Sequence, residues 1–136
     1  MNDNMTHEWN VRVYYEDTDA GGIVYHANYL KFCERARTEL LRSLGIEQDS
    51  YLKHNIAFVV TAMDIKFNSA AKFNDELVVF SEVLETKRAS VSFLQVIKQE
   101  ERVVFTAQVK VACVDSSVMR PSPMPKEILE VLRSAS

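Results

Sequence analysis

Apolar and polar residues alternate near the start of the chain, which is the pattern of a strand with one buried face. The apolar set is Val11, Val13 and Tyr15. We therefore predict a first strand over Asn10–Glu16. The loop that follows contains Gly21 and Gly22, and glycines permit backbone conformations and close approaches that side chains forbid.

From Asn28 to Leu44 the apolar residues recur every three or four positions, which predicts a helix with one buried face. This stripe consists of Tyr29, Phe32 or Cys33, Ala36, Leu40, Leu41 and Leu44. Gly45 follows where a glycine commonly ends a helix. At roughly 25 Å, this helix is the longest expected element. A short helix or irregular link is expected from Glu47 to His54.

Strand-like alternation returns in four successive segments. Their apolar positions are Met63, Ile65 and Phe67; Leu77, Val79 and Val83; Val91 and Phe93; and Val103, Phe105, Ala107, Val109, Val111 and Cys113. Short turns are expected at Asn74-Asp75, Lys87-Arg88-Ala89 and Gln99-Glu100-Glu101, so neighbouring strands should pair as an antiparallel meander. A final amphipathic helix over Lys126–Arg133 follows Pro121, Pro123 and Pro125.

This order of elements predicts an α+β fold rather than the alternating pattern of a parallel sheet. A five-stranded, curved antiparallel sheet needs a cover for its apolar face, and the long helix is the only expected element large enough. We therefore expect the sheet to wrap around that helix. The length of 136 residues suits a single domain over 1–136.

Composition narrows the class of protein and its partners. Hydrophobic residues make up 47% and charged residues 26% of the chain, which excludes a disordered or low-complexity protein. The formal net charge of -3 provides no global basic field for a nucleic acid. Local basic residues could still hold an anionic ligand.

The cysteines and the N-terminus indicate the compartment. Cys33 and Cys113 lie far apart among apolar neighbours and have no metal-ligand spacing, so we expect two reduced core residues and no metal site. Met1–His7 lacks an apolar signal-peptide core, and no apolar run is long enough to cross a membrane. We expect a soluble, cytoplasmic protein.

The segment from Asp17 to Tyr29 combines residue types that acyl transfer requires. Thioester hydrolysis needs a carboxylate or imidazole to activate water, or a carboxylate to attack, together with a donor for the carbonyl oxygen. Asp17, Asp19 and His26 supply such side chains. The unpaired N–H groups at the start of the helix, near His26 and Ala27, are candidate donors.

The same segment resembles the signature of the 4-hydroxybenzoyl-CoA thioesterase family. The matching run is Tyr15-x-Asp17-Thr18-Asp19-Ala20-x-Gly22-Ile23-Val24-Tyr25-His26-Ala27-Asn28-Tyr29. It is most similar to the branch of short acyl-CoA thioesterases associated with the bacterial Tol-Pal cell-envelope system. The resemblance implies a hotdog fold and hydrolysis of an acyl-CoA to a free acid and CoA, with no cofactor.

The resemblance also implies roles for single residues. Asp19 takes the position of the catalytic carboxylate, as general base or nucleophile. The backbone N–H of His26 takes the position that polarises the thioester carbonyl, and its side chain orients water or the thioester. Asp17 is expected to hold the loop. The residues expected near the substrate are Gly22, Tyr25 and Asn28, with Phe58, Val60 and Met63 as candidates for the acyl pocket.

The family further implies an assembly and a phosphate site. Its members form homodimers with active sites at the dimer interface, and the dimers often pair into tetramers; an exposed sheet edge favours association independently. CoA carries phosphates that require basic residues, for which Lys87, Arg88 and Arg120 are the candidates. An acyl carrier protein is a further candidate partner.

Simpler interpretations remain for each of these features. Asp-x-Asp before glycines also occurs in solvated turns, Asn28 could cap the helix, and Lys87-Arg88 could be an ordinary exposed turn. Tyr14 and Tyr15 are expected to pack in the core or an interface. Two other functions also remain: a non-catalytic acyl-CoA or acyl-carrier binding module, and a hotdog dehydratase or hydratase, for which the helix lacks the usual pairing of His with a carboxylate.

Overall fold

The computed structural model describes residues 5–136. Residues 1–4, which belong to the Met1–His7 stretch considered above, lie outside the described residues. The elements in chain order are β1 (Thr6–Arg12), a 3-10 helix (Tyr15–Asp17), α1 (His26–Ser43), α2 (Gln48–Leu52), β2 (Ile56–Phe67), β3 (Glu76–Lys87), β4 (Ser90–Gln99), β5 (Arg102–Asp115), β6 (Arg120–Pro121) and α3 (Lys126–Ala135).

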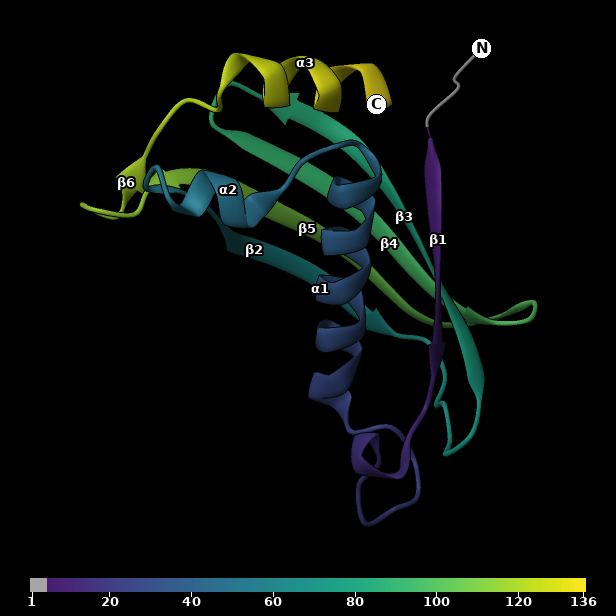
Figure 1. The fold of residues 1–136 in the computed structure, drawn as a ribbon. Helices are drawn as coiled ribbons and strands as arrows, with labels where there is room; N and C mark the ends of the chain where they lie inside the picture. Colours follow the sequence, from purple (N-terminus) through teal and green to yellow (C-terminus); the bar gives the residue numbers. More distant parts are fainter. Residues whose placement is uncertain (1–4) are drawn as a thin grey trace.

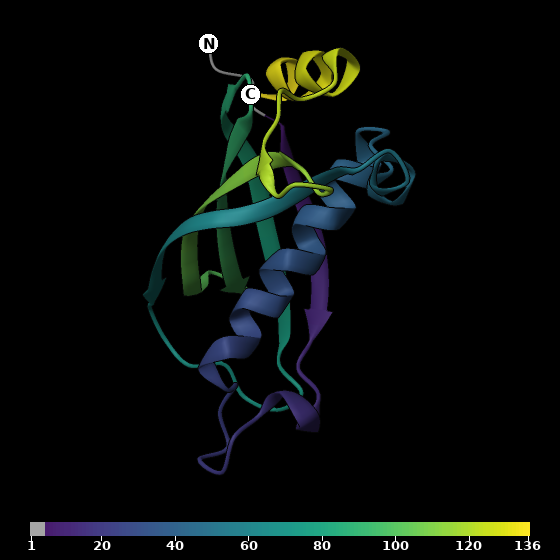
Figure 2. The same cartoon turned by 90° about the vertical axis from the view of Figure 1, so that its left-hand side faces the viewer.

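One antiparallel sheet curls around α1 (Figures 1 and 2). Its strand order is β1-β3-β4-β5-β2, and the short β6 pairs with β5. The predicted α+β arrangement, a curved sheet around one long helix, is therefore confirmed. The sheet has one strand more than predicted, because β6 is too short to produce an alternating pattern.

The predicted meander is only partly right. β3, β4 and β5 pair in succession as expected, but β2 pairs with β5 at the far edge of the sheet and β1 pairs with β3. The chain therefore crosses from one edge of the sheet to the other between β2 and β3. That crossing segment, residues 68–75, passes the start of α1, where the Val24 N–H donates to the carbonyl of Ala71 at 2.9 Å.

The predicted boundaries of the first strand were wrong. β1 begins at Thr6 and ends at Arg12, and the chain then turns into the 3-10 helix. Val11 and Val13 are buried as expected, but Tyr14 and Tyr15 are 61% and 80% exposed, so neither packs in the core. The alternation ran past the strand because tyrosine fits an apolar pattern whether or not it is buried.

The long helix is confirmed with a start two residues earlier than predicted. α1 buries its predicted stripe against the sheet, from Tyr29 through Phe32 and Cys33 to Leu41. It ends before Gly45, whose φ of +84° is the left-handed conformation that glycine adopts readily. Cys33 and Cys113 are free and buried, as expected.

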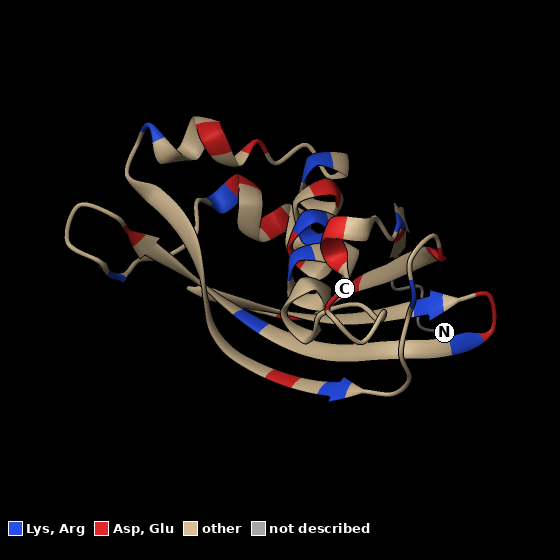
Figure 3. Ribbon diagram, turned by 90° about the horizontal axis from the view of Figure 1, so that it is seen from below, with Lys and Arg blue, Asp and Glu red and all other residues tan. Residues whose placement is uncertain are grey.

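Charged residues are mixed rather than sorted. Figure 3 shows Lys and Arg interspersed with Asp and Glu along the helices and at strand ends. Across the described part of the chain, no helix combines the length and apolar character needed to cross a membrane.

Candidate functional site

Asp17 ties the loop after β1 to the start of α1. One oxygen of its carboxylate accepts from the Tyr14 N–H at 2.8 Å, and the other accepts from Nδ2 of Asn28 at 3.0 Å. Its backbone carbonyl accepts from the Tyr25 N–H at 2.8 Å. Both carboxylate oxygens are therefore engaged within the chain, which fits the structural role expected for this residue.

Asn28 does not cap the helix, so that alternative was wrong. The cap position is Tyr25, and Asn28 lies inside the first turn of α1. Its side chain is buried and turns back to Asp17. The amide thus fixes the loop instead of completing the helix end.

Asp19 lies on a tight turn that leaves part of its carboxylate available. Oδ1 accepts from the Gly21 N–H at 2.8 Å, whereas Oδ2 has no hydrogen-bond partner among residues 5–136. The backbone carbonyl of Asp19 accepts from the Gly22 N–H, and the Asp19 N–H donates to the carbonyl of Ile23. Gly22 has a φ of +81°, which side-chain-bearing residues rarely adopt, so the turn requires glycine there.

The first two residues of α1 present free hydrogen-bond donors beside this turn. The N–H groups of His26 and Ala27 have no acceptor within the described chain, as is usual for the first turn of a helix. The helix dipole adds a partial positive charge at this end. The His26 ring lies 4.4 Å from the Tyr25 ring and 6.3 Å from the Phe67 ring, measured between centroids.

These groups surround one open hollow of about 400 Å³. Its lining consists of Asp19, Ile23, Val24, His26, Tyr29, Phe67, Ser69 and Ala70. The hollow combines a carboxylate, an imidazole and free N–H donors with apolar walls, which are the groups expected for acyl transfer. No three His, Cys, Asp or Glu side chains of the described chain gather closely enough to hold a metal ion.

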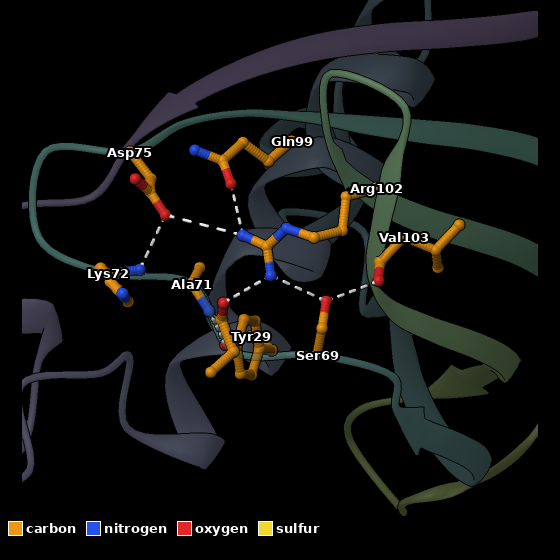
Figure 4. A network of polar contacts seen from close by, with 9 residues as sticks. Tyr29, Ser69, Ala71, Lys72, Asp75, Gln99, Arg102 and Val103 are labelled. Carbon is orange, nitrogen blue, oxygen red and sulfur yellow. Dashed lines mark hydrogen bonds and ion pairs between the residues drawn. The ribbon is translucent and has the colours of Figure 1, made fainter.

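Arg102 holds two residues of the wall of this hollow, Ser69 and Ala70, through hydrogen bonds (Figure 4). Its Nη1 donates to the carbonyl of Ala70 at 2.8 Å and to the hydroxyl of Ser69 at 3.0 Å. Its Nη2 donates to Gln99 and lies 3.9 Å from a carboxylate oxygen of Asp75. The crossing segment is therefore clamped to the turn between β4 and β5.

Tyr29 links the same segment to α1. Its hydroxyl accepts from the Ala71 N–H at 3.1 Å, and its ring stacks on Phe105 at 5.2 Å. Burial raises the pKa of the Tyr29 phenol, and the hydrogen bond from Ala71 opposes this. Tyr29 was predicted only as a core residue, but it also forms part of the hollow.

Other residues expected near the substrate lie outside the hollow of a single chain. Tyr25 is exposed and packs on His26. Lys87 and Arg88 lie at the turn between β3 and β4, where the Arg88 carbonyl accepts from the Met124 N–H ahead of α3. Figure 1 shows this turn near α3, at the other end of the sheet from the Asp19 loop. Arg120 lies in β6.

The crossing segment (residues 68–75) and its anchor Arg102 were not predicted from the sequence. Ser69, Ala70 and Ala71 form a run of small residues between two strands, and such a run can mark a place where backbone approaches a ligand closely. Nothing in the sequence pairs this run with Arg102, because the contact depends on β2 and β5 lying side by side.

The chain is similar to known thioesterases in sequence and in fold. The model of the thioesterase-like superfamily matches residues 13–132. The chain is 51% identical to the acyl-CoA thioesterase YbgC of Haemophilus influenzae, over 87% of this chain and 88% of that protein. It is 43% identical to the acyl-CoA thioester hydrolase YbgC of Escherichia coli, over 89% and 91%. A probable thioesterase from Bartonella henselae superposes with a TM-score of 0.83 at 32% identity, over 89% of this chain and all of that chain.

Proposed function

Because the chain belongs to the thioesterase-like superfamily and has acyl-CoA thioesterases among its relatives, we infer that it is an acyl-CoA thioester hydrolase. We further propose that Asp19 is its catalytic carboxylate, acting as general base or nucleophile. The observation that supports this role is the placement of a partly free Asp19 carboxylate in the same hollow as the free N–H of His26.

The thioester carbonyl oxygen accepts a hydrogen bond from the His26 N–H in this proposal. That donor sits at the positive end of α1 and stabilises the negative charge that develops on the oxygen. Asp19 removes a proton from a water molecule as the water oxygen attacks the carbonyl carbon. When the carbon–sulfur bond breaks, the proton passes to the departing CoA thiolate, and a free acid remains. The His26 ring orients the water or the thioester.

If Asp19 attacks instead, its carboxylate oxygen bonds to the carbonyl carbon and the CoA thiolate leaves with a proton from solvent. Water then hydrolyses the resulting anhydride and restores the carboxylate. Both routes use the same donor, because each develops charge on the same carbonyl oxygen.

The enzyme acts as a homodimer joined along β2. Within residues 5–136 this strand has a partner on only one side. The β2 residues that pair with buried residues of β5 lie on the same face of the sheet, the face that packs against α1. Four apolar side chains on this face of β2 nevertheless remain 36% to 50% exposed: Val60, Met63, Ile65 and Phe67. Such an apolar strip along an open strand edge needs a cover. A partner subunit there would also close the exposed side of the Asp19 hollow and exclude water.

A two-fold dimer along β2 also gives the distant basic residues a role. A strand that pairs with its own copy across a two-fold axis must do so antiparallel. The Ile56 end of one subunit then lies beside the Phe67 end of the other. Arg120, Lys87 and Arg88 belong to the Ile56 end, so those of the partner would approach the hollow and hold the CoA phosphates. Pairing of dimers into a tetramer belongs to the same proposal.

Thiol release from a panel of acyl-CoAs and acyl-carrier thioesters tests the reaction class. The proposal predicts saturable release from at least one acyl-CoA. Tight binding without release from any thioester would favour a binding module. Hydration of an unsaturated acyl-CoA with the thioester intact would favour a hydratase.

A further inference from the structure

A second cavity lies beside the middle of α1, away from Asp19. It has a volume of about 180 Å³. Its lining residues come from α1, the link to α2, α2, β2, β4, β5 and α3, and most of them are apolar, including Leu41, Val91, Phe93 and Leu132. No residue of this lining belongs to the hollow around Asp19. Along α1, Arg37 of this cavity lies eleven residues from His26, or roughly 16 Å at the helical rise.

Arg37 brings a buried positive charge to this cavity. The residue is 8% exposed and lines the cavity wall. Burial lowers the pKa of its guanidinium, which stays charged because arginine does not lose its proton in proteins. No carboxylate of residues 5–136 lies within 4.0 Å of it. The exposed Glu34, one turn earlier on α1, also lines the cavity and acts on the guanidinium at longer range. A buried charge without a direct ion-pair partner is costly.

A hydrogen-bond network through Gln95 holds the guanidinium in place. Nη1 of Arg37 donates to Oε1 of Gln95 at 2.9 Å. Nε2 of Gln95 donates to the Cys33 carbonyl and to the Ser81 hydroxyl, each at 2.9 Å. Gln95 and Ser81 are fully buried. Because both N–H groups of the Gln95 amide already have acceptors, the amide cannot turn over, and its oxygen is held facing Arg37. The guanidinium is therefore fixed before any ligand binds.

Most N–H donors of Arg37 have no acceptor in this network. A guanidinium has five N–H donors, and only Nη1 has an acceptor within the described chain. The lining of the Asp19 hollow contains no Lys or Arg, so a carboxylate ligand meets a guanidinium in this cavity and not in that hollow.

We propose that this cavity binds a small carboxylic acid, with its carboxylate on Arg37 and its apolar body against the surrounding side chains. Guanidinium and carboxylate match in geometry and charge. Cavities of about 150 Å³ hold a ligand the size of benzene, so this volume suits hexanoate or benzoate. The acid released by a thioesterase belongs to this class. Identifying the ligand with that product rests on the proposed function, whereas the binding itself does not.

Titration with hexanoate, followed by methyl NMR shifts and calorimetry, tests the site. We expect saturable binding with shifts at Val91 and Leu41, and no such binding of hexylamine or hexanol. Arg37→Met should weaken hexanoate binding at least about tenfold, since hydrogen bonds to charged groups carry that much. Arg35→Met, which removes an exposed arginine two positions earlier, should leave it unchanged.

Two further variants keep the outcome decisive. Val91→Leu narrows the cavity without touching Arg37 and should also weaken hexanoate binding, even if Arg37→Met fails to fold. Asp19→Asn should bind hexanoate like the wild type whether or not Asp19 is catalytic, which separates this site from the proposed function. Equal affinity in Val91→Leu, shifts at Ala70 instead of Val91, or absence of hexanoate binding would overturn the proposal.

Discussion

Two aspartates two positions apart have different surroundings. Asp17 has both carboxylate oxygens engaged by Tyr14 and Asn28, whereas Asp19 uses one oxygen for the Gly21 N–H. The sequence alone supports this division only through the family resemblance, because both are aspartates in a glycine-containing loop. Asn28 shows what the sequence alone does not reveal. Its position near the start of the helix favours a capping role, but its hydrogen-bond partner is Asp17, because the loop folds back on the helix.

Gly22→Ala tests the conformation of the Asp19 turn. Alanine in the left-handed region costs roughly 1–2 kcal/mol, and Gly22 has a φ of +81°. Since no atom lies within 4 Å of an added Cβ there, the loss arises from the backbone alone. We expect the free energy of unfolding, measured by urea denaturation, to fall by that amount. We also expect a reduced kcat, because Asp19 shifts.

Gly45→Ala is the matched control, since Gly45 also has a positive φ and open space around it but lies at the far end of α1. It should lose similar stability and keep its kcat. Equal loss of kcat in both variants would mean that activity follows stability and not the turn.

Among the helices and strands, local patterns predicted the types of elements well and their neighbours less well. The 3.6-residue period of α1 and the alternation of β5 are strong, and both elements form with their expected buried faces. The pairing of β2 with β5 was not predictable, since alternation identifies a buried face but not the strand beside it. The Arg102 clamp on residues 68–75 depends on that pairing and so was missed as well.

Arg102→Lys tests the role of this clamp. Lysine keeps the charge but cannot reach Ser69, Ala70 and Gln99 together as the guanidinium does. Because the Arg102 side chain is 44% exposed, we expect a loss of only about 1 kcal/mol in the free energy of unfolding. Ser69 and Ala70 line the hollow, so KM for acyl-CoA should rise.

Arg12→Lys serves as a comparison, because Arg12 of β1 pairs with Glu76 of β3 through exposed side chains that do not line the hollow. It should leave KM unchanged. A wild-type KM in Arg102→Lys, despite the lost stability, would assign the clamp to stability alone.

At the scale of the whole molecule, the Asp19 hollow includes Phe67, the last residue of β2, and β2 is an edge strand of the described sheet. The fold class followed from the order of elements, but the place of the substrate site relative to the basic residues did not. Within one chain the loop before α1 and the turn between β3 and β4 lie at opposite ends of the sheet (Figure 1). The proposed dimer would bring them together, and one sequence does not specify its own partner geometry.

Mixing two inactive variants tests this assembly. Asp19→Asn removes the carboxylate, and the triple variant Lys87→Glu, Arg88→Glu, Arg120→Glu reverses the charge of the proposed phosphate contacts. If each site uses Asp19 of one subunit and the basic residues of the other, refolding an equal mixture should restore about one quarter of wild-type activity, since half of the dimers are mixed and each has one intact site. A mixture as inactive as its components would contradict a shared site.

The rate of thiol release by Asp19→Asn at saturating acyl-CoA tests the central claim most directly. Asparagine keeps an acceptor for the Gly21 N–H, so folding and the affinity for acyl-CoA should persist while kcat falls about 10²- to 10⁴-fold. Glu16→Gln, which neutralises an exposed acid in the same loop, should keep its kcat. A kcat in Asp19→Asn within twofold of the wild type would show that another group performs the chemistry.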